Sequence, residues 1–261
     1  MTFNFRPSVR EATPLLIGLV GPSGSGKTCS ALRLAAGIQR VRGGQIAALD
    51  TEARRMLHYA DHFKFLHAEF GAPFASDRYA EAIKEAAEAA AGGVVIVDSM
   101  SHEHEGPGGY LDYHEQEVKR LVEKGGFRNE MAAQIPAWNR PAQRRRTLIN
   151  TILQINCAFI FCFRAKEKLK IKKGEDPKPL GWQAIAGDEF VYEMTARCLL
   201  VPGAAGVPDW SDDAFGLGVP KLPKSLRHAF ESGKQLDEST GEKLARWALG
   251  EVKPAKEAVA A

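Results

Sequence analysis

Short apolar runs alternate with amphipathic stretches along most of the chain. Six runs rich in Val, Ile, Leu, Ala and Phe have the length of buried strands: 15–20, 45–50, 63–67, 94–98, 157–163 and 190–201. Apolar residues recur at helical spacing in 29–40, 77–91, 140–155 and 242–249. Strands that alternate with helices predict an α/β protein with a mostly parallel, doubly wound sheet flanked by helices. Its ligands are expected at the carboxyl ends of the strands.

The pattern changes after Pro202, where Pro and Gly interrupt the chain more often. We therefore expect one core domain over residues 1–203 and a small C-terminal extension over 204–250. Residues 251–261, rich in Lys, Pro, Ala and Glu, are expected to form a disordered tail.

Composition and charge narrow the class of protein. The net charge of +3 argues against a protein that coats nucleic acid by bulk charge alone. Since no apolar run approaches about 20 residues, no membrane span is predicted. The first residues lack the apolar core of a signal peptide, and the four cysteines show no C-x-x-C spacing. We expect reduced, mostly buried thiols in a cytoplasmic protein.

The most specific motif is an eight-residue run between the first strand and the first helix. It reads Gly21, Pro22, Ser23, Gly24, Ser25, Gly26, Lys27, Thr28 and fits the phosphate-binding pattern G-x-x-x-x-G-K-[ST]. The glycines allow backbone N–H groups to turn inward toward a polyphosphate. Lys27 supplies a positive charge for the β- and γ-phosphates, and the Thr28 hydroxyl is a ligand for Mg²⁺. The helix that follows, beginning with Cys29, would add its dipole to an ATP site formed by these nine residues.

Acidic residues end two of the predicted strands. Asp98 follows the run 94–97 and is placed to hold Mg²⁺ directly or through water. Because Ser99 follows it instead of a glutamate, the catalytic base must come from another segment. Glu52, in Asp50-Thr51-Glu52 after the second strand, is the first candidate to deprotonate the attacking water. Helix capping is the alternative role for this segment, and Glu103 and Glu105 are rival bases.

The order of these motifs resembles the core of the RecA/RadA recombinases over roughly residues 12–202. It also resembles the shorter, phage-type RecA-like ATPases that work with single-strand annealing proteins. This resemblance implies a P-loop NTPase core in which Glu52 is the base, Asp98 binds the metal and Tyr59 stacks on adenine. For Tyr59, packing into the core is an equal alternative. The resemblance also implies a homo-oligomer with ATP at the subunit interface, and single-stranded DNA as a partner.

One position departs from the recombinase pattern. Bacterial RecA has an Asn-Gln pair after the fourth core strand that senses the γ-phosphate, whereas this chain has Phe163-Arg164. Arg164 is therefore expected to be an altered sensor or a charge donated to a neighbouring subunit.

Two basic segments are candidates for contacts with DNA phosphates. Lys166, Lys168, Lys170 and Lys172 alternate along a segment that would form an extended ribbon, with Trp182 beyond it as a stacking side chain. A solvated hairpin kept soluble by lysines is the alternative. For the second cluster, which contains Arg128, Arg140, Arg144, Arg145 and Arg146, we favour ordinary helix-surface charge.

Three histidines, His102, His104 and His114, lack the spacing of a zinc site. We interpret His102 and His104 as loop residues near the γ-phosphate, beside a glycine-rich loop over 106–109.

Together these features predict a Mg²⁺-dependent, DNA-stimulated ATPase of recombination or repair. Two other classes stay open: a P-loop kinase of a small molecule, with 140–146 as its arginine lid, and a nucleotide-switched accessory of phage assembly or packaging. ATPase activity with and without single-stranded DNA distinguishes them.

Overall fold

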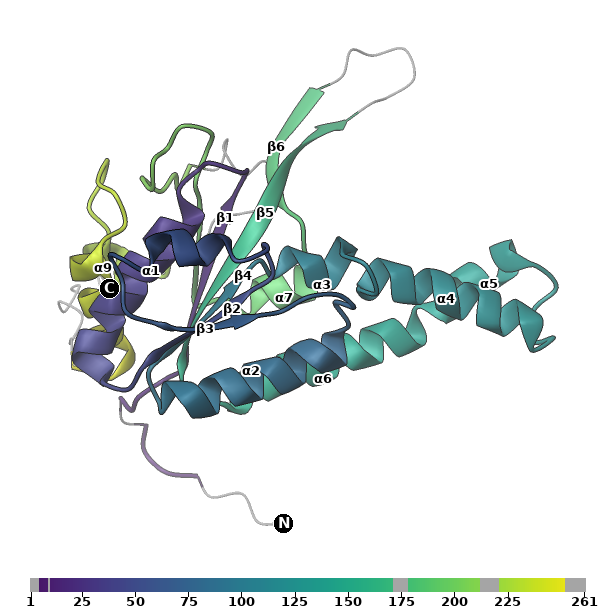
Figure 1. The fold of residues 1–261 in the computed structure, drawn as a ribbon, viewed down its shortest axis with the longest axis horizontal. Coiled ribbons are helices and arrows are strands. Elements are labelled where there is room, and N and C mark those ends of the chain that lie inside the picture. Colours follow the sequence, from purple (N-terminus) through teal and green to yellow (C-terminus); the bar gives the residue numbers. More distant parts are fainter. Residues whose placement is uncertain (1–4, 9, 171–177, 212–220, 252–261) are drawn as a thin grey trace, which may run out of the picture.

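The computed structural model describes residues 5–8, 10–170, 178–211 and 221–251. They form an α/β fold in which a seven-stranded sheet lies between helices on both of its faces (Figure 1). The predicted α/β class and the mostly parallel, helix-flanked sheet are confirmed.

The sheet has six parallel strands in the order β3-β2-β4-β5-β1-β7, and β6 pairs antiparallel with β5. The strands are β1 (Leu15–Gly21), β2 (Ile46–Asp50), β3 (Leu66–Glu69), β4 (Val94–Asp98), β5 (Ala158–Lys170), β6 (Lys178–Ala184) and β7 (Ala196–Leu199). Two strands, β4 and β5, separate β1 from β2, whereas β1 and β2 are neighbours in the common dinucleotide-binding and flavodoxin-like orders. The order therefore differs from both of these folds.

The strands are apolar on both faces because each face is covered by helices. In β1, Leu15, Ile17 and Leu19 belong to the core on one face, while Leu16 and Val20 belong to the core on the other. This alternation follows from the two-residue period of a strand and explains why the sequence shows a continuous apolar run.

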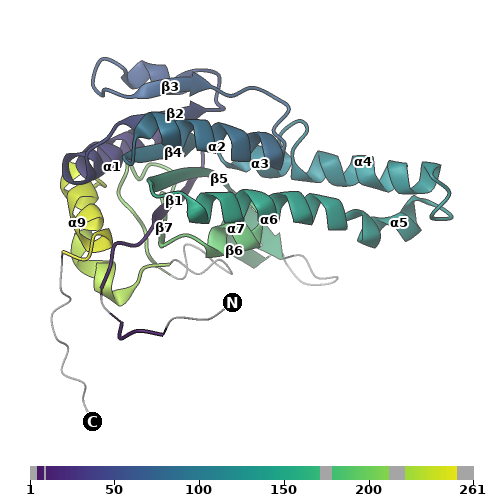
Figure 2. The same ribbon diagram turned by 90° about the horizontal axis from the view of Figure 1, so that it is seen from below.

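Helices α1 and α9 cover one face of the sheet, and α2 and α6 cover the other (Figure 2). The helices are α1 (Lys27–Arg42), α2 (Ser76–Ala90), α3 (Ser101–Glu105), α4 (Tyr110–Glu123), α5 (Glu130–Ala137), α6 (Asn139–Gln154), α7 (Asp188–Tyr192) and α9 (Glu238–Ala248). The described residues also contain two 3₁₀ segments, η1 (Arg55–Tyr59) and η2 (Lys224–Ala229).

The predicted extension over 204–250 shares the core of the sheet. Leu226, Leu236 and Leu244 are buried in the same cluster as the apolar face of α1. Helix α9 approaches α1 so closely that a Cβ atom at Gly37 would overlap the carbonyl oxygen of Glu238. Residues 252–261 of the predicted tail lie outside the described part of the chain.

The segment between β4 and α6 departs most from the sequence prediction. It forms α3, α4 and α5, and α4 and α5 project from the sheet as a helical arm (Figures 1 and 2). His102 and His104 lie within α3, so the prediction that they are loop residues is wrong. A small apolar cluster of Val118, Ala133 and Ala137 joins α4 to α5.

Two predicted strands also have different bounds. The strand expected over 63–67 begins at Leu66 and ends at Glu69. The apolar run over 190–201 contains the end of α7 and then β7, because Phe190 and Val191 are buried on a short helix instead of a strand.

Candidate functional site

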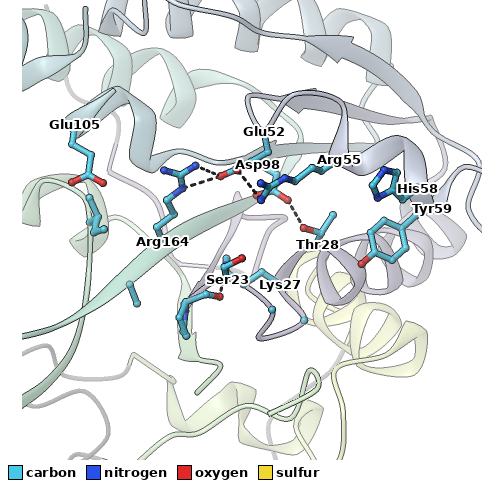
Figure 3. Close-up of a pocket in the computed structure, with 15 residues that line it drawn as sticks. Ser23, Lys27, Thr28, Glu52, Arg55, His58, Tyr59, Asp98, Glu105 and Arg164 are labelled. Carbon is cyan, nitrogen blue, oxygen red and sulfur yellow. Dashed lines mark hydrogen bonds and ion pairs between the residues drawn. The ribbon is translucent and has the colours of Figure 1, made fainter. Parts of the chain in front are cut away.

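A cavity of about 630 Å³ opens at the carboxyl ends of β1, β2, β4 and β5 (Figure 3). It brings together most of the residues that the motifs identified: Pro22, Ser23, Gly24, Gly26, Lys27, Thr28, Glu52, Tyr59, Asp98 and Arg164. The rival base Glu105 also lines it, as do Arg55 and His58, which the motifs did not identify. These segments meet because parallel strands place their carboxyl ends at one edge of the sheet.

The loop between β1 and α1 needs glycine for its shape. Gly24 and Gly26 have φ angles of 78° and 93°, a left-handed region that favours glycine. At Gly26, a Cβ atom would lie 2.8 Å from the backbone nitrogen of Gly206. The buried Ser25 hydroxyl donates to the Pro22 carbonyl at 2.9 Å and fixes the turn.

Lys27 folds back onto this loop. Its Nζ donates to the carbonyl oxygens of Gly21 at 2.8 Å and Pro22 at 2.7 Å. Burial lowers the pKa of Lys27, with the nearby Arg164 guanidinium acting in the same direction. The ammonium group therefore lies at the cavity wall with partners that an anion can replace.

The N-terminus of α1 points its backbone donors at the same space. Gly26 occupies the N-cap position, and within the described structure no side chain caps the helix and no acidic residue lies in its first turn. Uncapped N–H groups and the helix dipole favour an anion here. The loop, Lys27 and the helix terminus thus fit a polyphosphate.

Thr28 and Asp98 lie side by side in the cavity. The Thr28 hydroxyl donates to Asp98 Oδ2 at 2.6 Å. Asp98 is only 4 % exposed; burial raises the pKa of its carboxyl group, and the bond from Thr28 acts in the opposite direction. A hydroxyl and a carboxylate this close supply the hard oxygen ligands that Mg²⁺ prefers.

Glu52 faces the cavity from the end of β2. Its Oε1 accepts hydrogen bonds from Arg164 Nε at 2.9 Å and Nη2 at 2.7 Å, and Arg55 Nη1 lies 3.4 Å from Oε2 (Figure 3). Its side chain is 14 % exposed, which leaves it accessible to a small molecule.

Asp50, two residues earlier, has a structural role. Its carboxylate accepts from the backbone N–H groups of Glu52 and Met56 at 2.8 and 2.9 Å, and it contacts His67 Nε2 at 3.1 Å. Of the two acids in this segment, Asp50 holds the turn and Glu52 reaches the cavity.

The two rival bases, Glu103 and Glu105, also differ in whether the side chain is occupied by partners or faces the cavity. Glu103 is 3 % exposed and is occupied by Arg145 and by the Ser76 hydroxyl, which donates to it at 2.6 Å. Glu105 is exposed and lines the cavity. Glu52 and Glu105 are thus the acids that the structure leaves available for contact with a ligand.

The remaining predicted ATP contacts lie at the rim. Tyr59, at the end of η1, lines the cavity and also packs against the core beneath α1, so both interpretations of this residue agree with its position. Burial raises the pKa of Tyr59. Gly21, Ser25 and the half-buried Cys29 support the loop behind the cavity wall.

The predicted DNA ribbon is a β-hairpin. β5 continues beyond Arg164 to Lys170, pairs with β6, and projects from the sheet (Figure 1). Lys166 is exposed, whereas the side chains of Lys168 and Lys170 and all of Lys172 lie outside the described residues. Trp182 packs against the core on the α2 face, so in this conformation its ring is partly covered.

The arginines of α6 do not form a lid. Arg145 is 1 % exposed, Arg140 pairs with Glu117 at 2.7 Å, and Arg144 lies 4.0 Å above the Tyr113 ring. Among the described residues that line the cavity, none belongs to this helix. Helix-surface charge is confirmed for Arg140, Arg144 and Arg146, but it is wrong for the buried Arg145 and for Arg128, which lies in the bend between α4 and α5.

The three histidines have separate environments. His102 Nδ1 contacts Thr51 Oγ1 at 2.7 Å, His104 Nδ1 contacts Arg145 at 3.0 Å, and His114 Nε2 contacts the Gln134 carbonyl at 2.9 Å. In the part of the chain that the structure covers, no three His, Cys, Asp or Glu residues are grouped as metal ligands would be.

No protein-family model matches the sequence, and no curated protein shows significant similarity to it. Within the described residues, none of the helices has both the length and the apolar character to cross a bilayer.

Proposed function

We propose that the chain binds ATP with Mg²⁺ at residues 21–28 and hydrolyses it, as a RecA-like ATPase that acts on single-stranded DNA in recombination or repair. One observation carries this proposal. A single cavity collects Lys27, the Thr28–Asp98 pair and Glu52 from the ends of three parallel strands.

Each of these residues has a role that its position supports. The backbone donors of the loop and the α1 N-terminus would hold the β- and γ-phosphates, and Lys27 would exchange its loop carbonyls for phosphate oxygens. Thr28 and Asp98 would hold Mg²⁺, which neutralises phosphate charge when bound.

Glu52 is the proposed general base. Its carboxylate would take a proton from water while the water oxygen bonds to the γ-phosphorus and the bond to the β–γ bridging oxygen breaks. ADP and inorganic phosphate are the products. Arg164 now occupies the Glu52 oxygen that would accept this proton, so we propose that it moves to the terminal phosphate when the triphosphate binds.

The hairpin that follows Arg164 is the proposed DNA contact. β5 runs directly from the cavity into it, and the exposed Lys166 lies two residues beyond Arg164. Lysine contacts to phosphate would give binding that depends on salt and not on base sequence. By resemblance we also propose a homo-oligomer with ATP between subunits.

The decisive experiment measures phosphate release from ATP and Mg²⁺, with and without single-stranded DNA. We expect Lys27→Ala to abolish turnover, while the exposed α2 variant Lys84→Ala keeps it. Normal hydrolysis by Lys27→Ala would refute the site. Stimulation by DNA supports the recombination role, and turnover without stimulation refutes that part alone.

The identity of the base is tested by a matched pair of variants. Glu52→Gln should bind ATP and lose hydrolysis, whereas Glu105→Gln, which changes the exposed acid of the cavity, should keep it. The opposite result would assign the base to Glu105. Binding of ATP without turnover in the unmodified protein would favour a nucleotide-switched assembly accessory.

A further inference from the structure

Thr51 joins the ends of β2 and β4 through three hydrogen bonds. Its backbone N–H donates to the Asp98 carbonyl at 2.7 Å, and its hydroxyl donates to the Ser99 carbonyl at 3.1 Å. The same Oγ1 accepts the backbone N–H of Ser99 at 2.6 Å. Thr51 and Ser99 are 8 % and 1 % exposed, so these bonds form in a protected environment.

These bonds lie between Glu52 and Asp98, two of the carboxylates that line the cavity. The strand register of β2 and β4 ends with Asp50 opposite Asp98. The next residue on each chain is Thr51 or Ser99, beyond the last pair of the strand register. The Thr51 hydroxyl therefore extends the strand pairing by one residue, to the position from which Glu52 leaves β2.

A fourth contact ties this junction to α3. Thr51 Oγ1 lies 2.7 Å from His102 Nδ1, and the His102 ring stacks on Phe74 at 4.7 Å. This contact joins the end of β2 to α3, and the tautomer of the His102 ring sets which of the two atoms donates. Burial lowers the pKa of His102, which favours the neutral ring.

We propose that Thr51 is a positioning residue that holds Glu52 in a fixed relation to Asp98 during hydrolysis. This inference rests on the proposed function, because it assigns Thr51 to the same reaction. A side chain without the hydroxyl would leave the Ser99 N–H without its partner and leave the backbone bond to the Asp98 carbonyl as the remaining one of the three bonds that hold the start of the Glu52 segment to β4.

The test compares Thr51→Val, which keeps the shape and removes the hydroxyl, with Thr51→Ser, which keeps the hydroxyl. We expect Thr51→Val to lower kcat for ATP about 10- to 100-fold, the cost of displacing a catalytic group by about 1 Å. Its KM should stay within about threefold of the original value, because the phosphate loop is unchanged. Thr51→Ser should restore kcat.

A matched control separates positioning from general loss of stability. The Tyr79 hydroxyl donates to the same Ser99 carbonyl at 3.1 Å, is also buried and contacts Thr51, but the Ser99 N–H bonds to Thr51 Oγ1 and not to Tyr79. Tyr79→Phe should therefore lower the free energy of unfolding in urea, as Thr51→Val does, and keep kcat. Binding of a fluorescent ADP analogue, which needs no turnover, should be the same in all three variants.

Three results would overturn the inference: an unchanged kcat in Thr51→Val, an equal loss of kcat in Tyr79→Phe, or loss of ADP binding in Thr51→Val. In each case the unmodified protein still hydrolyses ATP, so the proposed function stands. If the unmodified protein binds no nucleotide or does not hydrolyse ATP, the proposed function itself fails and the role of Thr51 fails with it.

Discussion

Breaking the buried ion pair between Arg145 and Glu103 should cause a large loss of stability. Arg145 lies on α6, and its guanidinium donates to Glu103 on α3 through Nε at 3.1 Å and Nη2 at 2.8 Å. It also pairs with Glu189 on α7 at 3.3 Å and lies 3.4 Å above the Tyr110 ring. Arg145→Met removes all of these contacts and keeps most of the apolar length of the side chain.

The size of the loss in stability depends on the charge that Arg145→Met leaves buried. The side chains of Arg145 and Glu103 are 1 % and 4 % exposed, so the substitution leaves a carboxylate buried without its counter-charge. Removing one partner of a buried pair costs about 3–5 kcal/mol. Because the Ser76 hydroxyl still donates to Glu103, we expect the lower part of this range, about 3–4 kcal/mol in the free energy of unfolding.

Urea unfolding, followed by tryptophan fluorescence and circular dichroism, measures this loss. The neighbouring exposed Arg146 is the matched control, and Arg146→Met should stay within about 0.5 kcal/mol of the original protein. In the double variant Glu103→Gln/Arg145→Met the buried charge is gone, so its loss should be smaller than the sum of the single losses by about 2 kcal/mol. A loss below about 1 kcal/mol for Arg145→Met, or additive losses, would refute the reasoning.

Two further predictions concern charge near the cavity. If Arg164 moves from Glu52 to the terminal phosphate, Arg164→Gln should lower the affinity for a non-hydrolysable ATP analogue at least about tenfold and leave the affinity for ADP unchanged. The control Arg54→Gln changes an exposed side chain outside the cavity and should alter neither affinity. An equal effect on both nucleotides would contradict this. Burial and Arg145 lower the pKa of His104 to about 4. The unfolded chain therefore binds the proton more tightly than the folded protein. His104 lowers the free energy of unfolding as the pH falls from about 6.5 to 4, and it has no such effect above about pH 6.5. The urea midpoint of His104→Gln should fall less across this window than that of the original protein, and equal slopes would count against it.

The fold class could be predicted because its signals are local. Runs such as 94–97 and 157–163 are apolar at every position, which is expected only where helices cover both faces of a sheet. The helical arm could not be predicted in the same way. Its helices α4 and α5 bury few apolar side chains, chiefly Val118, Ala133 and Ala137, and α5 contains an internal proline, Pro136, which argues against a helix.

The sequence pattern of α6 already predicts that Arg145 is buried. Pro141, Arg145, Leu148, Ile149 and Ile152 are the buried residues of α6, and they recur at helical spacing. Arg145 therefore occupies an apolar face, while Arg144 and Arg146 do not. The helical period alone places this arginine in the interior, although its acidic partners come from α3 and α7 and are visible only in the fold.

The choice of the catalytic base also depends on partners that are visible only in the fold. The sequence motifs alone therefore gave several candidate bases. Asp50, Glu52, Glu103 and Glu105 all follow strands that end at the cavity, so position in the sequence does not separate them. Their partners do. Asp50 is held by backbone N–H groups and Glu103 by a buried arginine, and breaking either set would expose or strand a buried charge. The Glu52 bonds come from Arg164, whose side chain is 40 % exposed, and can be exchanged at lower cost. A group that must accept a proton during a reaction needs partners of this second kind, and this difference favours Glu52 over its two buried neighbours.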